Sequence, residues 1–316
     1  MNNNDTILSA IEPDVADRLA RSAEEISQGR TTSSVVGAGL AMASIPIALA
    51  ALSRDAFAQT STTVTDVLNF ALMLEIFENE FYKAVLNKSS SSAQNTAFNT
   101  VRATIPAAAL PTFTQIQKHE QAHVDFLLAN GASNVLSLNA DSFDFTGARG
   151  AGNGPFAQAT TNLQHLLLVT QAAEDTGVRA YKGQAPNLMS NTTVLEAALR
   201  IHSVEARHAA KIRRLRRQNG ATNVKYSGTI TGGNRAAAGA DNVPNPPAGA
   251  LTALDAVYAG EENSTTQGTV NLSTLPNLPG SNFVAATAAS EAFDEPLTKA
   301  QVIAIVQPFF KPTIPA

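Results

Sequence analysis

The sequence contains no cysteine and no tryptophan among its 316 residues. The absence of cysteine excludes disulfides, thiolate metal sites, iron–sulfur clusters and a cysteine nucleophile. Histidine and carboxylate side chains would have to hold any metal, which favours iron, manganese or zinc over copper(I). Charged residues are also sparse, at 15% of the chain, and the formal net charge is −4. This weakly acidic balance argues against a nucleic-acid partner.

Long apolar runs are scarce as well, and the most prominent one lies near the N-terminus, at residues 35–52. Ala56-Phe57-Ala58 follows it as a small-residue cleavage signal, so residues 1–58 are predicted to be an export leader. The run is nearly long enough to cross a bilayer, and an uncleaved membrane anchor is the alternative. Cleavage would leave no stable membrane span and would place the mature chain in the periplasm or cell envelope.

Residues 59–220 carry helical periodicity in four segments. The expected helices cover about residues 66–86, 112–130, 156–182 and 194–218. Thr65 is predicted to cap the first helix, and Thr193 with Glu196 to form a capping box on the fourth. The linker at residues 131–154 is long enough to run the length of the bundle. The pattern therefore predicts two helical hairpins joined by one long crossover.

Two Glu-x-x-His patterns lie on the second and fourth of these helices. This spacing places a carboxylate and an imidazole on one helix face. The other two helices each carry a glutamate on an inward stripe, and four carboxylates converging in a core would repel one another unless protonated or bound to a cation. The sequence therefore predicts a two-metal site. Its predicted ligands are Glu75, Glu120, His123, Glu174, Glu205 and His208.

The first and third helices share a second pattern, in which Tyr-Lys follows the glutamate by seven residues. This repeat predicts a pseudo-twofold arrangement. The residues that could support the ligands are Glu78, Tyr82, Tyr181 and His202. Glu78 could instead be a ligand or solvated, the tyrosines could be core residues with a polar tip, and His202 an ordinary surface or core histidine. His119 is expected to point away from the ligands.

Residues 221–316 are predicted to form a loop-rich C-terminal extension. Gly, Asn, Thr, Pro and Ala dominate residues 221–290, with a possible strand pair around 224–230. Residues 298–306 predict a short amphipathic helix that could pack on the bundle. The basic cluster at 213–217 lies at a helix C-terminus, where dipole compensation and solvation explain it.

The six-ligand pattern resembles that of the ferritin-like superfamily, which includes rubrerythrins and bacterioferritins. Residues 68–75 (LNFALMLE) and Glu80-Phe81-Tyr82 resemble more narrowly the bacterial ferritin-like domain family that includes desiccation-related proteins, and residues 292–298 (AFDEPLT) are similar to the end of that family. The resemblance implies an all-α, antiparallel four-helix bundle with a long crossover between helices two and three. The chain lacks the four-cysteine module of rubrerythrins, has Gln121 where bacterioferritins bind haem through methionine, and carries a long tail that disfavours a 24-subunit cage.

The resemblance also implies two metal ions, with iron favoured over manganese. Glu75 and Glu174 would be terminal ligands and Glu120 and Glu205 would bridge. The implied function is a peroxidase-, catalase- or ferroxidase-like oxidoreductase acting on O₂ or peroxide in oxidative or desiccation stress, with an external electron donor and a homodimer as possible partners. The alternatives are a non-enzymatic envelope protein with a structural metal, or iron storage.

Overall fold

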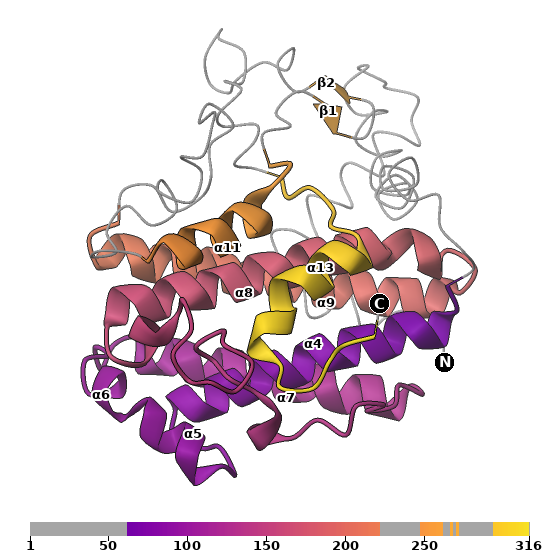
Figure 1. Cartoon of the computed structure of the whole chain (residues 1–316). Coiled ribbons are helices and arrows are strands. Elements are labelled where there is room, and N and C mark those ends of the chain that lie inside the picture. The colour runs from indigo at the N-terminus through magenta and orange to yellow at the C-terminus, as the bar shows by residue number, and fades with distance from the viewer. Residues whose placement is uncertain (1–61, 222–246, 262–265, 268–269, 272–292, 316) are drawn as a thin grey trace, which may run out of the picture. The chain divides into compact units, whose positions relative to one another are not determined.

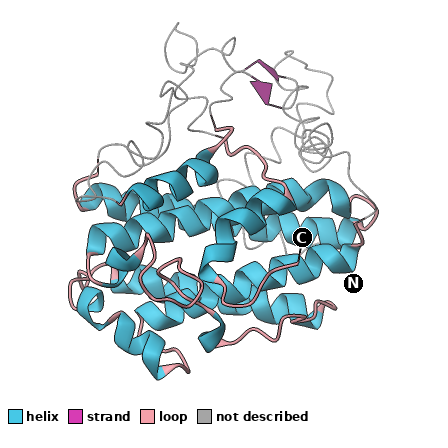
Figure 2. Cartoon of the chain, viewed as in Figure 1, coloured by secondary structure: helices cyan, strands magenta, loops and turns pink. Residues whose placement is uncertain are grey.

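The computed structural model describes residues 62–221, 247–261, 266–267, 270–271 and 293–315 (Figures 1 and 2). The export leader predicted at residues 1–58 and the strand pair predicted around 224–230 lie outside these residues. None of the helices in the described part of the chain combines the length and apolar character that a membrane crossing needs.

Four long helices form the bundle. They are α4 (Val64–Val85), α7 (Leu110–Ala129), α8 (Leu163–Gln184) and α9 (Thr192–Gln218). Helix α4 pairs with α7 and α8 pairs with α9, while α4 also contacts α8 and α7 contacts α9 (Figure 1). The predicted all-α four-helix bundle is confirmed.

The starts of these helices differ from the predictions. Thr63, not Thr65, caps α4, because its hydroxyl accepts from the backbone N–H of Asp66 at 3.1 Å. Asn191 caps α9 by accepting from the N–H of Val194 at 3.1 Å, so the predicted capping box at Thr193 was wrong. In both cases a competing side chain two residues upstream of the predicted one caps the helix.

The third helix also starts later than predicted. Residues 157–160 form the short 3₁₀ helix η2 (Ala157–Thr160), and Asn162 then caps α8 with its side-chain oxygen, which accepts from two backbone N–H groups. The link between α4 and α7 holds two short helices that were not predicted, α5 (Ser92–Ala97) and α6 (Asn99–Arg102).

The crossover between α7 and α8 contains a second 3₁₀ helix, η1 (Ala140–Ser142), and pairs with the C-terminal residues. Phe143 and Phe310 form an antiparallel bridge, and the N–H of Lys311 donates to the carbonyl of Ser142 at 2.9 Å. Phe77 of α4 lies beneath them, with ring centroids 5.7 Å from Phe143 and 5.5 Å from Phe310. Aromatic side chains, although few, thus gather where the crossover meets the bundle.

The C-terminal extension is more helical than predicted. It contains α11 (Ala248–Tyr258), α13 (Lys299–Val306) and the 3₁₀ helix η5 (Gln307–Phe309), with a two-residue strand pair, β1 (Thr266–Gln267) and β2 (Val270–Asn271). The helix predicted at 298–306 matches α13, which contacts α8. The loop predicted across 221–290 was wrong for α11, because Leu254 and Val257 pack on Leu168 and Ala172 of α8 and stabilise the helix by burial.

Arg179 of α8 links the C-terminal extension to the bundle through hydrogen bonds. Its fully buried guanidinium donates to the carbonyls of Glu295 at 2.7 Å and Ala259 at 2.6 Å. The N–H of Leu297 in turn donates to the carbonyl of Arg179. Leu297 passes so close to Gly183 that a β-carbon there would lie 1.9 Å from its carbonyl oxygen, so glycine is required at this crossing.

Two arginines of the basic cluster at 213–217 are structural rather than solvated. Arg213 forms an ion pair with the buried carboxylate of Asp175, and fully buried Arg216 donates to Gln171 at 2.8 Å. Tyr258 of α11 donates to Asp175 at 2.8 Å. The cluster therefore links α9, α8 and α11, which corrects the prediction for these two residues.

Candidate metal centre

The structure brings all six predicted ligands together in the middle of the bundle. All are buried, with exposed fractions between 0% and 8%. Glu75 comes from α4, Glu120 and His123 from α7, Glu174 from α8, and Glu205 and His208 from α9. Each of the four helices thus supplies at least one carboxylate.

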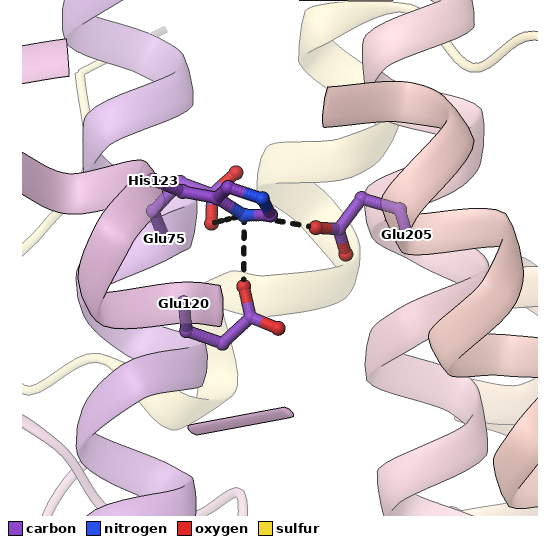
Figure 3. Close-up of side chains that lie close together, drawn as sticks. All are labelled: Glu75, Glu120, His123 and Glu205. Carbon is purple, nitrogen blue, oxygen red and sulfur yellow. Dashed lines mark hydrogen bonds and ion pairs between the residues drawn. The ribbon is translucent and has the colours of Figure 1, made fainter. Parts of the chain in front are cut away.

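The first group of side chains surrounds His123 (Figure 3). The Nδ1 atom of His123 lies 3.0 Å from an oxygen of Glu75, 3.2 Å from one of Glu120 and 3.2 Å from one of Glu205. Three carboxylates from three helices therefore converge on one imidazole nitrogen.

The second group surrounds His208. Its Nδ1 atom lies 2.8 Å from Glu120, 3.3 Å from Glu174 and 3.9 Å from Glu205. In each group, one potential ligand atom per residue lies within 4.8 Å of every other. Glu120 and Glu205 belong to both groups, so two four-residue groups meet across two shared carboxylates.

Several potential ligand atoms are buried in the described part of the chain without a partner in hydrogen-bond geometry, although ion-pair distances join some of them to one another. They are Oε1 of Glu120, Oε2 of Glu174, both oxygens of Glu205 and Nδ1 of His208. A buried polar atom left unpaired costs about 1–3 kcal/mol. A cation among these atoms would satisfy them, and carboxylate oxygen with imidazole nitrogen suits iron, manganese or zinc. The residues present could therefore hold metal ions.

Electrostatics lead to the same conclusion. Burial, followed by the nearby carboxylates of Glu120 and Glu75, raises the pKa of Glu205 well above its usual range. Burial raises the pKa of Glu120 to about 7, although the close contacts with His123 and His208 oppose it. Burial also acts to raise the pKa of Glu75, but the hydrogen bond and charge of His123, together with the contacts to Glu120 and Tyr181, outweigh it and the net shift is downward. Without a cation, the centre therefore holds protons that a metal would displace.

The two predicted tyrosines each contact a carboxylate of the opposite hairpin. Tyr82 of α4 donates to Glu174 of α8, and Tyr181 of α8 donates to Glu75 of α4 at 2.5 Å. These reciprocal contacts require α4 and α8 to run antiparallel. They also fix the orientation of the two carboxylates that belong to only one group each.

Glu78 lies beside the centre, and Gly177 of α8 leaves the space for it. A β-carbon at position 177 would lie 3.2 Å from an oxygen of Glu78 and 3.2 Å from one of Glu205. Burial, followed by Glu205 and Glu174, raises the pKa of Glu78 well above its usual range. Glu78 occupies the position three residues after Glu75, and Gly177 the position three residues after Glu174, so the pseudo-twofold repeat breaks here.

Three histidines, His119, His165 and His202, lie outside both groups. Nδ1 of His119 lies 2.9 Å from Nε2 of His208, and its own Nε2 lies 2.7 Å from Gln115. His119 thus contacts a predicted ligand although the sequence analysis placed it facing away; its partner is 89 positions further on, and no local pattern marks the pair. His202 belongs to neither group, and its buried surroundings include Asp294 and Lys182.

A comparison with family models matches residues 63–218 to the ferritin-like domain. Searches of curated proteins and of solved structures found no match. The matched residues begin at the cap of α4 and end at the last residue of α9, so they coincide with the bundle that holds the centre. The chain is a member of the ferritin-like superfamily.

Proposed function

We propose that the protein binds two metal ions, iron or manganese, and uses them for redox chemistry on O₂ or peroxide. The observation that carries this proposal is the pair of four-residue groups that share Glu120 and Glu205. Two ions bound side by side supply a two-electron redox couple suited to oxygen chemistry.

The charges of the site support two ions rather than one. Glu75, Glu120, Glu174 and Glu205 carry four negative charges when deprotonated, and two divalent cations carry four positive charges. A single divalent cation would leave two buried negative charges uncompensated, which is costly in a site of this burial.

The residues of the chain divide into roles under this proposal. Glu120 and Glu205 would contact both ions, while Glu75 and Glu174 would each contact one and keep their orientation through Tyr181 and Tyr82. His123 and His208 would each contribute one nitrogen. The burial of all these groups excludes bulk water from the reacting atoms.

The cellular setting is part of the proposal and rests on the N-terminal sequence. The apolar run and the cleavage signal at 56–58 favour export to the periplasm or cell envelope. The chain lacks cysteine for an electron-transfer module, so we propose an external electron donor and a role in oxidative or desiccation stress, with a homodimer as the candidate assembly.

Metal analysis together with a peroxide assay tests the proposal. We expect about two iron or manganese ions per chain and peroxide consumption that falls on the order of 100-fold in a Glu120→Gln variant. The matched control is Asp125→Asn, because Asp125 is exposed on the same helix and the substitution removes the same charge. A metal-free protein, or equal activity in the two variants, would refute the proposal.

A structural metal is the second candidate, favoured by the complete burial of Glu120, Glu174 and Glu205. Metal bound only to the folded chain stabilises it by mass action. A melting temperature that falls after chelation, in a protein that consumes no peroxide, would support this role over catalysis. Iron storage instead predicts large oligomers and many iron atoms per chain, which size-exclusion chromatography and metal analysis measure.

A further inference from the structure

A large apolar cavity leads from the centre to one end of the bundle. Its volume is about 550 Å³, and it lies where α4 and α9 begin and α7 and α8 end. Apolar side chains from all four helices line it, among them Val67, Ala71, Phe126, Ala180, Ala198 and Ile201. Pockets of this size and composition accommodate small apolar ligands.

The inner end of the cavity is His123. Its Nδ1 atom faces the carboxylates of the centre, so Nε2 lies on the opposite side of the ring. Within the described residues, Nε2 of His123 has no hydrogen-bond partner, whereas Nε2 of His208 is paired with His119. Metal-binding histidines almost always donate this second N–H to an acceptor. An acceptor for His123 would have to come from within the cavity.

The outer end of the cavity has a different character. Glu196 and Arg200 of α9 are among its lining residues, and their side chains are 65% and 68% exposed. They already form an ion pair with each other at 2.5 Å. The rim is thus polar and internally paired, and the donor in need of an acceptor is at the inner end.

We propose that the cavity binds an aliphatic amphiphile, a fatty acid or fatty alcohol, with its oxygen at Nε2 of His123 and its hydrocarbon chain among the apolar side chains. A share of about 30 Å³ per water-sized unit gives room for about 18 non-hydrogen atoms, which corresponds to a chain of roughly 12–16 carbons. Burial of the chain drives binding, since each CH₂ removed from water raises the affinity about fourfold, and the oxygen sets the orientation.

The proposal goes beyond the proposed function, because the cavity is present whether or not the centre catalyses a redox reaction. The two can therefore fail separately. Metal content reports on the centre, and binding of an aliphatic chain reports on the cavity.

Isothermal titration of the full-length protein with hexadecanoic acid tests the proposal. We expect saturable binding of about one molecule per chain. An Ala198→Phe substitution would fill the cavity and weaken binding at least tenfold, with the metal content unchanged. The matched control is Ala129→Phe, on an exposed residue near the end of α7 that does not line the cavity. Hexadecane presented in the same way should bind more weakly than the acid, because it lacks the acceptor.

A second variant keeps the test decisive if Ala198→Phe does not fold. Ala71→Leu adds a smaller side chain to the same cavity from α4. Absence of saturable binding to the wild-type chain, or equal binding by folded cavity variants and Ala129→Phe, would overturn the proposal.

Discussion

On the His208 side of the centre, the outer ring nitrogen of the histidine lies 2.9 Å from His119, and Tyr82, which donates to Glu174, packs on Phe113 at a centroid distance of 6.0 Å. On the His123 side, the outer ring nitrogen lies at the end of a 550 Å³ cavity. The inner parts of the two halves match, since each has one histidine, one tyrosine-bound glutamate and two shared glutamates. The repeat therefore preserves the candidate metal ligands and varies their surroundings.

The comparison between the His123 and His208 sides is tested most strongly by two substitutions. One removes a ligand that belongs to both groups, and the other removes a ligand that belongs to a single group. Glu205→Gln should lower the affinity for both metal ions on the order of 100-fold, because Glu205 belongs to both groups. His208→Ala should lower the affinity for one of the two ions by a similar factor, so that about one ion per chain remains bound. Elemental analysis after dialysis against a weak chelator measures both, and loss of the same number of ions in the two variants would contradict the shared role.

Substitution of the two tyrosines tests whether the His123 group and the His208 group are equivalent. Tyr82→Phe and Tyr181→Phe each remove one hydrogen bond to a glutamate that belongs to a single group. Each should weaken one ion by about 10–100-fold, and the two variants should have effects of similar size. Competitive metal titration gives the two affinities. A large effect from only one tyrosine would show that the symmetry does not extend to these contacts.

Substitution of His119 tests the difference between the surroundings of His208 and those of His123. His119→Ala should weaken the ion on the His208 side by about tenfold, at the lower end of the range for an indirect contact. The ion on the His123 side should keep its affinity, because the described residues give His123 no equivalent partner. An equal loss of affinity for both ions would mean that the substitution disturbs the bundle as a whole and not His208 alone.

A substitution in the crossover separates effects on stability from effects on the centre. Asp144 accepts hydrogen bonds from the backbone N–H groups of Thr146, Gly150 and Gly152 at 2.7–3.0 Å. Burial acts to raise its pKa, but the hydrogen bonds from the Thr146 hydroxyl and these N–H groups outweigh it and lower the pKa. Asp144→Asn should cost about 1–3 kcal/mol of unfolding free energy with metal affinities unchanged.

The pH dependence of that loss has a definite sign. Because the pKa of Asp144 is lower in the folded than in the unfolded chain, its contribution is complete above the unfolded value near 3.9 and disappears as the pH falls through the folded value. The difference in stability between wild type and Asp144→Asn should therefore shrink below about pH 4, as measured by urea unfolding. A difference that stays constant down to pH 2 would contradict this account.

The part of the structure that follows from helical spacing could be predicted from the sequence. Periodicity located the four long helices, and the Glu-x-x-His spacing located His123 and His208 because a single helix fixes both members of each pair. The contact between His119 and His208 depends on how two helices cross, and the shape of the cavity depends on which small side chains face one another. Spacing along the chain determines neither of these.

Helix α11 was not predicted, for a related reason. Its alanines and leucines favour a helix, but the segment is short and lies in a region dominated by Gly, Asn and Pro, and a helix of this length is marginal without tertiary contacts. The partners that stabilise it are Leu168 and Ala172, which lie far away in the chain. The role of Gly177 could not be predicted from the sequence either, because it depends on how closely Glu78 of another helix approaches.

The pairing between the crossover and the C-terminal residues has a consequence for synthesis of the chain. Arg149 and Thr313, which join these two segments through a 3.0 Å hydrogen bond, are 164 positions apart. At a rate of about 5–20 residues per second, the ribosome needs roughly 10–30 s to add the residues between them. During that interval the bundle helices can assemble while the crossover still lacks its partner strand. The crossover therefore completes its hydrogen bonds later in synthesis than the helices of the bundle do.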